Sequence, residues 1–331
     1  MTTTPAVKSG LTAAVSGRRP RRDVDGILLL DKPPGLSSNR ALQVVRRQFD
    51  ARKAGHTGSL DPLATGMLPI CLGQATKVSG FLIECDKSYR VRVSFGSATE
   101  TGDAEGAVIA TGASELGEAP LRSALMEMRG TLQQIPPMYS ALKHQGRRLY
   151  QLARAGVTVA RPPRPVMIHD IDLEEYHPQH PVIRVRCGKG TYIRTLVEQI
   201  AERLGTVAHV AMLRRLTVGA FAATEMVTVA ALEQASASGG HRALDGMLLP
   251  VDRAVSSWPA VTISAEMVYR LRCGQRVDAA PDRSNTVAGL VRVYGEGAQF
   301  VGIGECLPGG GLVPWRLMAQ RAASPPGQFG L

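Results

Sequence analysis

Hydrophobic residues in the first 220 positions of the chain recur with two different periods. Alternation with period two, or a short continuous apolar run, is typical of strands, and these patterns occupy residues 26–30, 67–72, 87–96 and 182–187. In the third of these segments, one face carries Tyr89, Val91, Val93 and Phe95. We therefore predict a sheet that contains half-buried strands.

Apolar spacings of three and four residues predict helices between these strands. The first helix follows Ser37 or Ser38, either of which can cap it, and its apolar side carries Leu42, Val45 and Phe49. A second is indicated by Leu121, Leu125 and Met128. Residues 190–204 show the strongest amphipathic pattern, whereas the polar residues 234–242 are expected to form a loop.

Turn residues mark the connections. Asp31-Lys-Pro-Pro-Gly35 is expected to end the first strand in a turn, and residues 55–66 hold three glycines and a proline. We predict that residues 55–66 form a loop on a rigid frame, the usual setting of catalytic groups.

The chain divides into a basic tail over residues 1–22, expected to be disordered, a main domain over 23–258, and a smaller domain over 259–331. The boundary is placed at Trp258-Pro259. The last domain has short β-like runs at 289–294, 299–306 and 311–318, which predict a small barrel or sheet.

Composition is that of an ordinary globular protein, with 44% apolar and 20% charged residues among 331. No apolar run approaches the roughly 18 residues of a membrane span, and no secretory signal pattern is visible. The five cysteines form no CxxC pair, which favours a reducing compartment over a disulfide framework. A cytoplasmic protein is expected, with no membrane partner.

Positive charge is concentrated rather than spread. The net charge is +11, residues 1–22 carry +5, and residues 128–169 carry +7 without any Asp or Glu. Lys and Arg clusters bind polyanions by releasing condensed counterions. The short tail is interpreted as a solvated segment, but the longer stretch indicates a nucleic-acid partner.

Several common chemistries are excluded by motif. The chain has no GxxxxGK[ST] loop, Ser59 lies outside a GxSxG elbow, and the glycines of 308–311 lack GxGxxG spacing. His177 and His180 have a metal-like spacing, but Pro178 keeps them off a helix. We therefore expect neither a metal nor a cofactor.

One carboxylate remains as a candidate for chemistry. Asp61 is the only acid between Asp50 and Glu84, and it lies in the glycine-rich loop beside His56. An Asp before a proline is also a common turn former. The basic residues Arg52 and Lys53 nearby suit a phosphate-rich ligand, and an ionised carboxylate can act there as a nucleophile or a base.

The loop also carries a recognisable motif. Gly55-His-Thr-Gly-Ser-Leu-Asp-Pro-Leu-Ala-Thr-Gly66, with its continuation through Lys77, closely resembles the signature of the TruB family of tRNA pseudouridine synthases. Further segments that resemble the family in order are 26–35, 86–90, 135–143, 188–194 and 213–216. The resemblance covers residues 24–220 well and is looser over 259–331.

This resemblance implies a fold and an activity. The implied fold is the α/β (α+β) pseudouridine synthase fold with a mixed, mostly antiparallel sheet, followed by a small PUA-like β-barrel domain. The implied reaction converts uridine 55 of the tRNA T-arm loop to pseudouridine, without cofactor or metal. In it, the N1–C1′ bond breaks, the uracil turns, and C5 bonds to C1′.

Carried over by motif, Asp61 matches the catalytic aspartate, which attacks the sugar, attacks the base or removes the 2′ proton. Tyr89 matches the tyrosine that packs on the target base, and Arg194 the arginine that pairs with the aspartate. Leu213 matches an apolar wall of the uracil pocket, and His56 a residue that holds the loop open around the flipped base. From the residues alone, Tyr89 and Leu213 could equally be core and Arg194 a surface ion-pair partner.

Six cations are expected to bind the substrate backbone; they are Lys32, Lys143, Arg147, Arg148, Lys189 and Arg214. Three of them lie in the basic stretch, which overlaps an RNA-gripping insertion of the family at about residues 130–165. Guide-RNA-dependent relatives lack this insertion, so its presence favours a stand-alone, monomeric enzyme that needs no guide RNA or protein partner. The alternatives are a tRNA-binding folding chaperone with dispensable catalysis and a generic basic interaction protein.

Overall fold

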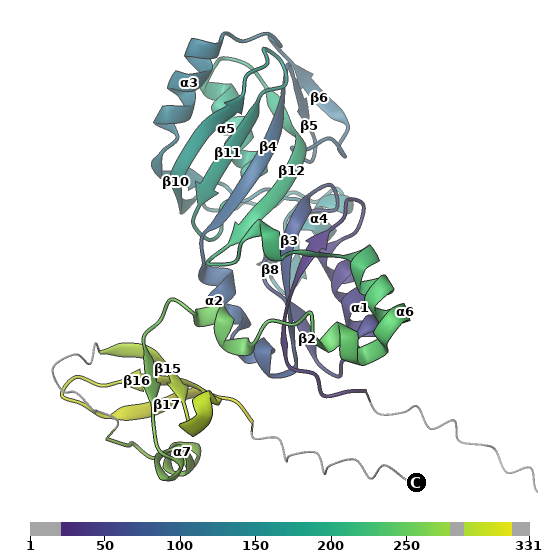
Figure 1. Cartoon of the computed structure of the whole chain (residues 1–331). Coiled ribbons are helices and arrows are strands. Elements are labelled where there is room, and N and C mark those ends of the chain that lie inside the picture. The colour runs from purple at the N-terminus through teal and green to yellow at the C-terminus, as the bar shows by residue number, and fades with distance from the viewer. Residues whose placement is uncertain (1–20, 279–287, 320–331) are drawn as a thin grey trace, which may run out of the picture.

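The protein was analysed as a computed structural model, which describes residues 21–278 and 288–319. The predicted basic tail therefore lies almost wholly outside the described residues. Within the described ranges, a long mixed sheet runs through the main part of the molecule, and a smaller sheet forms the C-terminal part (Figure 1). No helix among the described residues is both long and apolar enough to span a membrane.

The main sheet has nine strands within the described ranges. In spatial order they are β13 (Val227–Thr228), β1 (Gly26–Lys32), β3 (Thr65–Leu72), β12 (Ala208–Val218), β4 (Lys87–Phe95), β11 (Val182–Cys187), β10 (Arg164–Glu175) and β7 (Gly130–Gln134), with β2 (Ala54–His56) paired to β3. Strand β1 is parallel to β13 and β3 is parallel to β12, whereas the other pairs are antiparallel. The expected mixed, mostly antiparallel sheet is confirmed.

Helices and small hairpins surround this sheet. The helices are α1 (Ser38–Gln48), α2 (Ser79–Glu84), α3 (Glu118–Glu127), α4 (Leu149–Arg154), α5 (Ile193–Arg203) and α6 (Val229–Asp245). The hairpins are β5 (Ser97–Thr99) with β6 (Val108–Thr111), and β8 (Lys143–His144) with β9 (Arg147–Arg148). Helices α1 and α6 lie side by side at one end of the sheet, and α3 and α5 accompany the long strands at the other (Figure 1).

Strand β1 shows how the apolar pattern builds the core. Side chains of a strand alternate between the two faces of its sheet. Leu28 and Leu30 accordingly pack in one apolar cluster, while Ile27 and Leu29 pack in another on the opposite face. Because both faces are covered, this strand is continuously apolar rather than alternating.

The predicted amphipathic segments are also confirmed. On α5, the buried side carries Ile193, Leu196, Val197, Ile200 and Ala201. Ser37 is the N-cap of α1, where its side chain accepts a hydrogen bond from the amide of Arg40 at 3.2 Å. Ser38 has a different role, which concerns the loop that follows β2.

The prediction of a loop over residues 234–242 is wrong, because they belong to α6. Leu232, Ala235 and Leu244 are buried and hold the helix against the core, so tertiary packing outweighs the low helix propensity of the intervening polar residues. The helix is kinked at one of these glycines, Gly240, whose φ is +55°.

The C-terminal part forms its own sheet, consistent with the expected PUA-like domain. Its described strands are β14 (Ala260–Thr262), β15 (Gly289–Tyr294), β16 (Phe300–Cys306) and β17 (Leu312–Leu317), accompanied by α7 (Ala265–Arg272). Ile303 and Met318 join an apolar cluster with residues of β1 and β3, and Phe81 meets Trp258 edge to face at 4.8 Å. The two parts are therefore joined by apolar packing.

Candidate active site

The loop between β2 and β3, residues 57–64, is held in place by hydrogen bonds at several points. The Ser38 hydroxyl accepts from the Leu60 amide at 2.7 Å and donates to the Leu60 carbonyl at 2.9 Å. Arg215 donates to the Gly58 carbonyl at 3.0 Å and to the Met67 carbonyl at 2.6 Å. These contacts flank Asp61 in sequence, so the loop presents its carboxylate from a rigid frame. The predicted loop was two residues too long at each end, since β2 and β3 include those residues.

Lys32 lies beneath this loop rather than on its surface. Its ammonium is fully buried and donates to the carbonyls of Pro33 at 2.9 Å, Leu36 at 2.7 Å and Pro62 at 3.2 Å. The expected contact between Lys32 and substrate does not fit this geometry, because its three N–H donors are already used. Burial lowers the pKa of Lys32 to about 8, although the Asp61 charge opposes the shift.

Arg215 is a buried cation that was not predicted from the sequence as a site residue. Its neighbour Arg214 was predicted instead, as a substrate-binding cation. The two side chains alternate across β12, so Arg215 points inward with Leu213. Its strand position lies opposite Tyr89 on β4. The alternation on β12 was the available signal, because a residue two positions from a buried leucine shares its face.

Asp61 forms an ion pair with Arg194 at the centre of the site. The Arg194 Nε lies 3.1 Å from Asp61 Oδ2 and 3.8 Å from Asp103 Oδ2. The Arg194 and Asp103 side chains are 6% and 5% exposed, whereas that of Asp61 is 41% exposed. One side of the Asp61 carboxylate is therefore open to a ligand, and the other is fixed by a charge-assisted bond. Asp103 was not anticipated from the sequence.

The pKa of Asp61 is set by opposing influences. Burial raises the pKa of this carboxyl above its ordinary value, and the nearby Asp103 carboxylate raises it further. The Arg194 and Lys32 cations lower it. A carboxylate so balanced has a greater proton affinity than a solvated one, which suits a nucleophile or base.

Arg194 is buried in the first turn of α5 and donates from all three of its guanidinium nitrogens. Besides Asp61, it donates from Nη1 to the Thr101 carbonyl at 2.5 Å and from Nη2 to the Tyr139 carbonyl at 2.7 Å. The alternative interpretation as a surface ion-pair partner is therefore wrong. Three segments that are distant in sequence meet at this one guanidinium.

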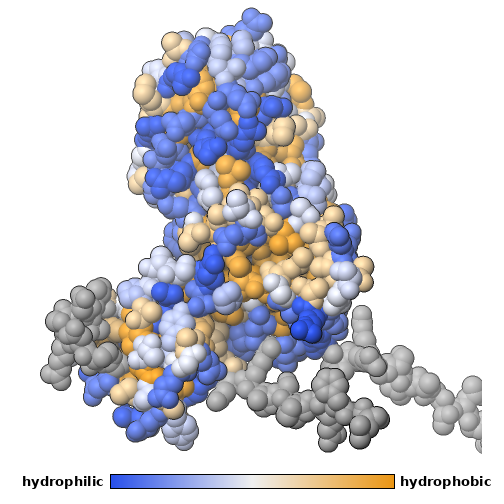
Figure 2. Space-filling view, viewed as in Figure 1, coloured by the Kyte–Doolittle hydropathy of each residue, from blue (hydrophilic) through white to orange (hydrophobic). Residues whose placement is uncertain are grey.

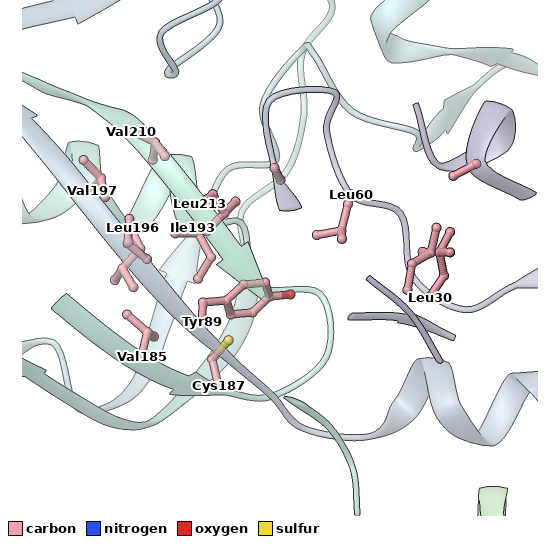
Figure 3. Packing of buried hydrophobic residues seen from close by; sticks show 14 of the residues in the cluster. Leu30, Leu60, Tyr89, Val185, Cys187, Ile193, Leu196, Val197, Val210 and Leu213 are labelled. Atoms are coloured by element: carbon pink, nitrogen blue, oxygen red, sulfur yellow. The ribbon is translucent and has the colours of Figure 1, made fainter. Parts of the chain in front are cut away.

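An apolar wall lies near the charged centre. Tyr89 and Leu213 are each 8% exposed and belong to the main apolar cluster. Figure 3 shows the Tyr89 ring beside Cys187 and Ile193, with its hydroxyl pointing away from the aliphatic side chains. Burial raises the pKa of Tyr89, whereas the Arg215 guanidinium lowers it. A flat apolar wall with one polar tip is suited to stacking and hydrogen bonding with a base.

His56 lies at the end of β2, at the edge of the loop. Its Nδ1 atom is buried without a hydrogen-bond partner among the described residues. Burial lowers the pKa of His56, and the cations of Arg215 and Arg148 lower it further. The imidazole is therefore neutral near pH 7 and retains an unused polar atom.

The remaining expected substrate-binding cations have two different environments. Lys143, Arg147 and Arg148 lie exposed on the β8–β9 hairpin. Arg214 instead donates twice to the Asp31 carboxylate, at 3.0 and 2.8 Å, and Lys189 pairs with Glu84.

The basic stretch also differs in extent from the expectation. Residues 130–134 form β7, an edge strand of the main sheet, so the segment outside the sheet covers 135–163.

Hydrophilic side chains dominate the visible surface around α3 and β10, and apolar side chains gather lower on this face (Figure 2). Among the described residues, no three His, Cys, Asp or Glu side chains gather as metal ligands would.

Comparison with known proteins places this geometry in a family. The chain is 50% identical over 301 residues to the tRNA pseudouridine synthase B of Pseudomonas putida strain GB-1. The aligned region covers 91% of this chain and 98% of that relative. It is 48% identical over 303 residues to the enzyme of the same name from Methylobacillus flagellatus. Here the aligned region covers 92% of this chain and 98% of the relative. This chain belongs to the TruB family of pseudouridine synthases.

Family models account for the TruB domains in turn. Residues 46–193 match the N-terminal domain of TruB family pseudouridylate synthases, and residues 194–256 match the tRNA pseudouridylate synthase B C-terminal domain. Residues 259–318 match the C-terminal region of pseudouridine synthase II TruB. The second matched region ends at residue 256 and the third begins at residue 259, so the boundary between them lies beside Trp258.

Solved structures share the TruB fold. A chain of a Cbf5–Nop10–Gar1 complex superposes with a TM-score of 0.65 at 25% identity, covering 85% of this chain and 78% of that one. A chain of an H/ACA ribonucleoprotein bound to a substrate RNA with 2′-deoxyuridine gives a TM-score of 0.68 at 22% identity, covering 89% and 86%. The likeness confirms the predicted pseudouridine synthase fold.

Proposed function

We propose that this protein isomerises uridine 55 in the T-arm loop of tRNA to pseudouridine. The N1–C1′ bond breaks, the uracil turns within the site, a C5–C1′ bond forms, and the C5 proton is released as N1 gains one. Atoms and charge balance without a cofactor. Asp61 serves as the nucleophile or base of this reaction.

The single observation that supports this proposal best is the half-open ion pair between Asp61 and Arg194 near the apolar wall of Tyr89 and Leu213. A uracil that stacks on Tyr89 brings its ribose to the open side of the carboxylate. Arg194 keeps that carboxylate ionised and aimed. The Tyr89 hydroxyl is suited to relay the proton that leaves C5, and Arg215 supports it from the neighbouring strand.

A base within a folded RNA loop is inaccessible, so it must be flipped out at a cost of a few kcal/mol. Stacking on Tyr89 and phosphate contacts from the exposed β8–β9 hairpin can offset that cost. We assign Lys143, Arg147 and Arg148 to these phosphate contacts, and His56 to holding the loop open through its unused Nδ1. Lys189 and Arg214 join them after releasing their acidic partners.

We further propose that the protein acts alone and as a monomer. The segment 135–163 supplies its own grip on the RNA, and most of the length of the tRNA pseudouridine synthase B relatives is matched by this chain. A guide RNA is then not needed to present the uridine.

The test is tritium release from C5-labelled uridine in a T-arm stem-loop transcript, with the wild-type protein and Asp61→Asn. We expect release by the wild type, a loss of at least about 10⁴-fold in the variant because no other group replaces the nucleophile or base, and equal RNA binding by both. The asparagine is nearly isosteric, so the fold is preserved.

Tight hairpin binding without tritium release by the wild type would overturn the proposal and favour the folding chaperone. Equal binding to the hairpin and to unrelated RNA would instead favour the generic basic interaction protein.

A further inference from the structure

The Arg194 guanidinium joins the catalytic loop to the segment outside the sheet. Its Nη2 donates to the Tyr139 carbonyl at 2.7 Å, while its Nε contacts Asp61 at 3.1 Å. Tyr139 belongs to residues 135–142, called the docking segment here, which lead from β7 to the β8–β9 hairpin. The position of this segment therefore bears directly on a catalytic side chain.

The docking segment is anchored near its two ends and at Ser140, whose carbonyl accepts from the Tyr150 amide at 3.1 Å. At its start, the buried Gln134 side chain accepts from the Tyr192 amide at 3.0 Å. At its end, the Leu142 carbonyl accepts from the Leu149 amide at 2.8 Å. Between these points, a groove of about 520 Å³ separates the segment from α5, and Ile135 is 52% exposed. Pro136 is buried, but residues 137–139 are only half-buried, so packing holds this part of the segment weakly.

One side-chain hydrogen bond spans this weakly packed stretch. The Tyr139 hydroxyl donates to Glu100 Oε1 at 2.7 Å. Glu100 immediately precedes Thr101, whose carbonyl accepts from Arg194 Nη1 at 2.5 Å. Tyr139, Glu100, Thr101 and Arg194 thus form a closed ring, in which Arg194 is held at two carbonyls and the Tyr139–Glu100 bond closes the far side.

We propose that the Tyr139–Glu100 hydrogen bond is a latch that seats the docking segment on Arg194, which makes both residues positioning residues for Asp61. The inference rests on the proposed function, because it concerns the same ion pair. RNA that binds the β8–β9 hairpin can displace the docking segment, because the two are continuous in sequence. The latch keeps the Tyr139 carbonyl hydrogen-bonded to Arg194 when RNA is bound. Without it, Arg194 loses one fixed acceptor and aligns less well with the carboxylate.

The experiment is single-turnover pseudouridine formation on the T-arm hairpin at saturating protein, with hairpin affinity measured separately. We expect Tyr139→Phe and Glu100→Ala each to lower the rate constant about tenfold, the effect of losing one charge-assisted hydrogen bond, while the affinity changes less than twofold. Glu100→Gln keeps an acceptor for the hydroxyl and should restore most of the rate. The double variant should be no slower than either single variant, because the two residues share one interaction.

The pH–rate profile supplies a second readout. Arg194 lowers the pKa of Asp61, so an Arg194 that is less well aligned with Asp61 should let that pKa rise. The acid limb of the pH–rate profile should therefore move to higher pH in Tyr139→Phe and Glu100→Ala. A purely structural loss would lower the rate at all pH values without moving the limb.

Tyr176→Phe is the matched control, since this hydroxyl donates to the Leu116 carbonyl at 2.8 Å, away from the ion pair. The latch is refuted if Tyr139→Phe and Glu100→Ala keep the wild-type rate and acid limb, if their effects add, or if Tyr176→Phe is equally slow. Glu100 is exposed, so its variants test the latch even if Tyr139→Phe folds poorly. An inactive wild type would refute the proposed function instead.

Discussion

At the scale of residues, burial, one neighbouring acid and two cations determine how readily Asp61 takes up a proton. Arg194 and Lys32 favour its ionised form, and burial and Asp103 disfavour it. Since the proposed chemistry needs the ionised carboxylate, activity should be full above its raised pKa and fall as the pH drops through that value.

Asp103→Asn tests this balance. Removing the Asp103 charge removes an influence that raises the pKa of Asp61, so the acid limb of the pH–rate profile should move to lower pH. The rate above the limb should fall, because Arg194 loses its second anionic neighbour and is held less rigidly. A limb that stays in place or moves upward in single-turnover measurements would contradict this account.

Lys32 links the same site to stability. Its pKa is about 8 when folded and about 10.5 when unfolded, so between these values the unfolded chain binds one proton more. The free energy of unfolding should therefore gain about 1.4 kcal/mol per pH unit from this residue as the pH rises from about 8 towards 10. Urea titrations of wild type and Lys32→Met over this range check it, since the variant should lack the gain.

At the scale of elements, the parallel pairing of β3 with β12 positions Arg215 against the loop that carries Asp61. Gly66 and Arg215 are partners in the parallel pairing of these strands. A Cβ on Gly66, where φ is +93°, would lie 2.2 Å from the Arg215 carbonyl oxygen. This close approach requires glycine and explains why the motif places one at the start of the strand.

Gly66→Ala should lower the free energy of unfolding by about 3 kcal/mol or more, because the strands must separate. Gly35→Ala is the matched variant, since φ there is +79° but nothing lies within 4 Å of the added Cβ. It should cost only about 1 kcal/mol for the unfavourable backbone conformation. Urea unfolding compares the two, and equal losses would show that the strand contact is unimportant.

At the scale of the whole molecule, the predicted substrate-binding cations divide into paired ones and the unpaired cations of the β8–β9 hairpin. Arg214 and Lys189 have acidic partners, at Asp31 and Glu84. The hairpin cations form no ion pair within the described residues, so they are free to meet phosphates.

Replacing Lys143, Arg147 and Arg148 together by Ala should weaken hairpin RNA binding and flatten its salt dependence. Each lost phosphate contact removes roughly 0.7–0.9 from the slope of log affinity against log salt. A fall of about two is therefore expected in titrations from low to moderate salt. Arg122→Ala, which removes a cation already paired with Glu118 on α3, should leave the slope within error.

Much of the fold followed from local pattern. The alternation in β4 and the amphipathic face of α5 predicted a sheet packed on a helix, and the structure confirms both. The loop predicted over 234–242 was wrong, since polar and glycine residues occupy the middle of α6 and long-range packing of Leu232 and Leu244 holds it helical. The long strands β10 and β12 were not predicted at all.

Sequence alone determined which residue we propose for the chemistry, because Asp61 lies in a long ordered motif that resembles the family signature. It also predicted the strands β1, β3, β4 and β11 and their apolar faces, since periodicity is a local property. Tertiary structure alone decided that Asp103 and the Tyr139 carbonyl meet Arg194, and that Lys32 is buried while the hairpin cations are exposed. Those relations join positions dozens of residues apart, and no local pattern encodes a contact that exists only after the chain has packed.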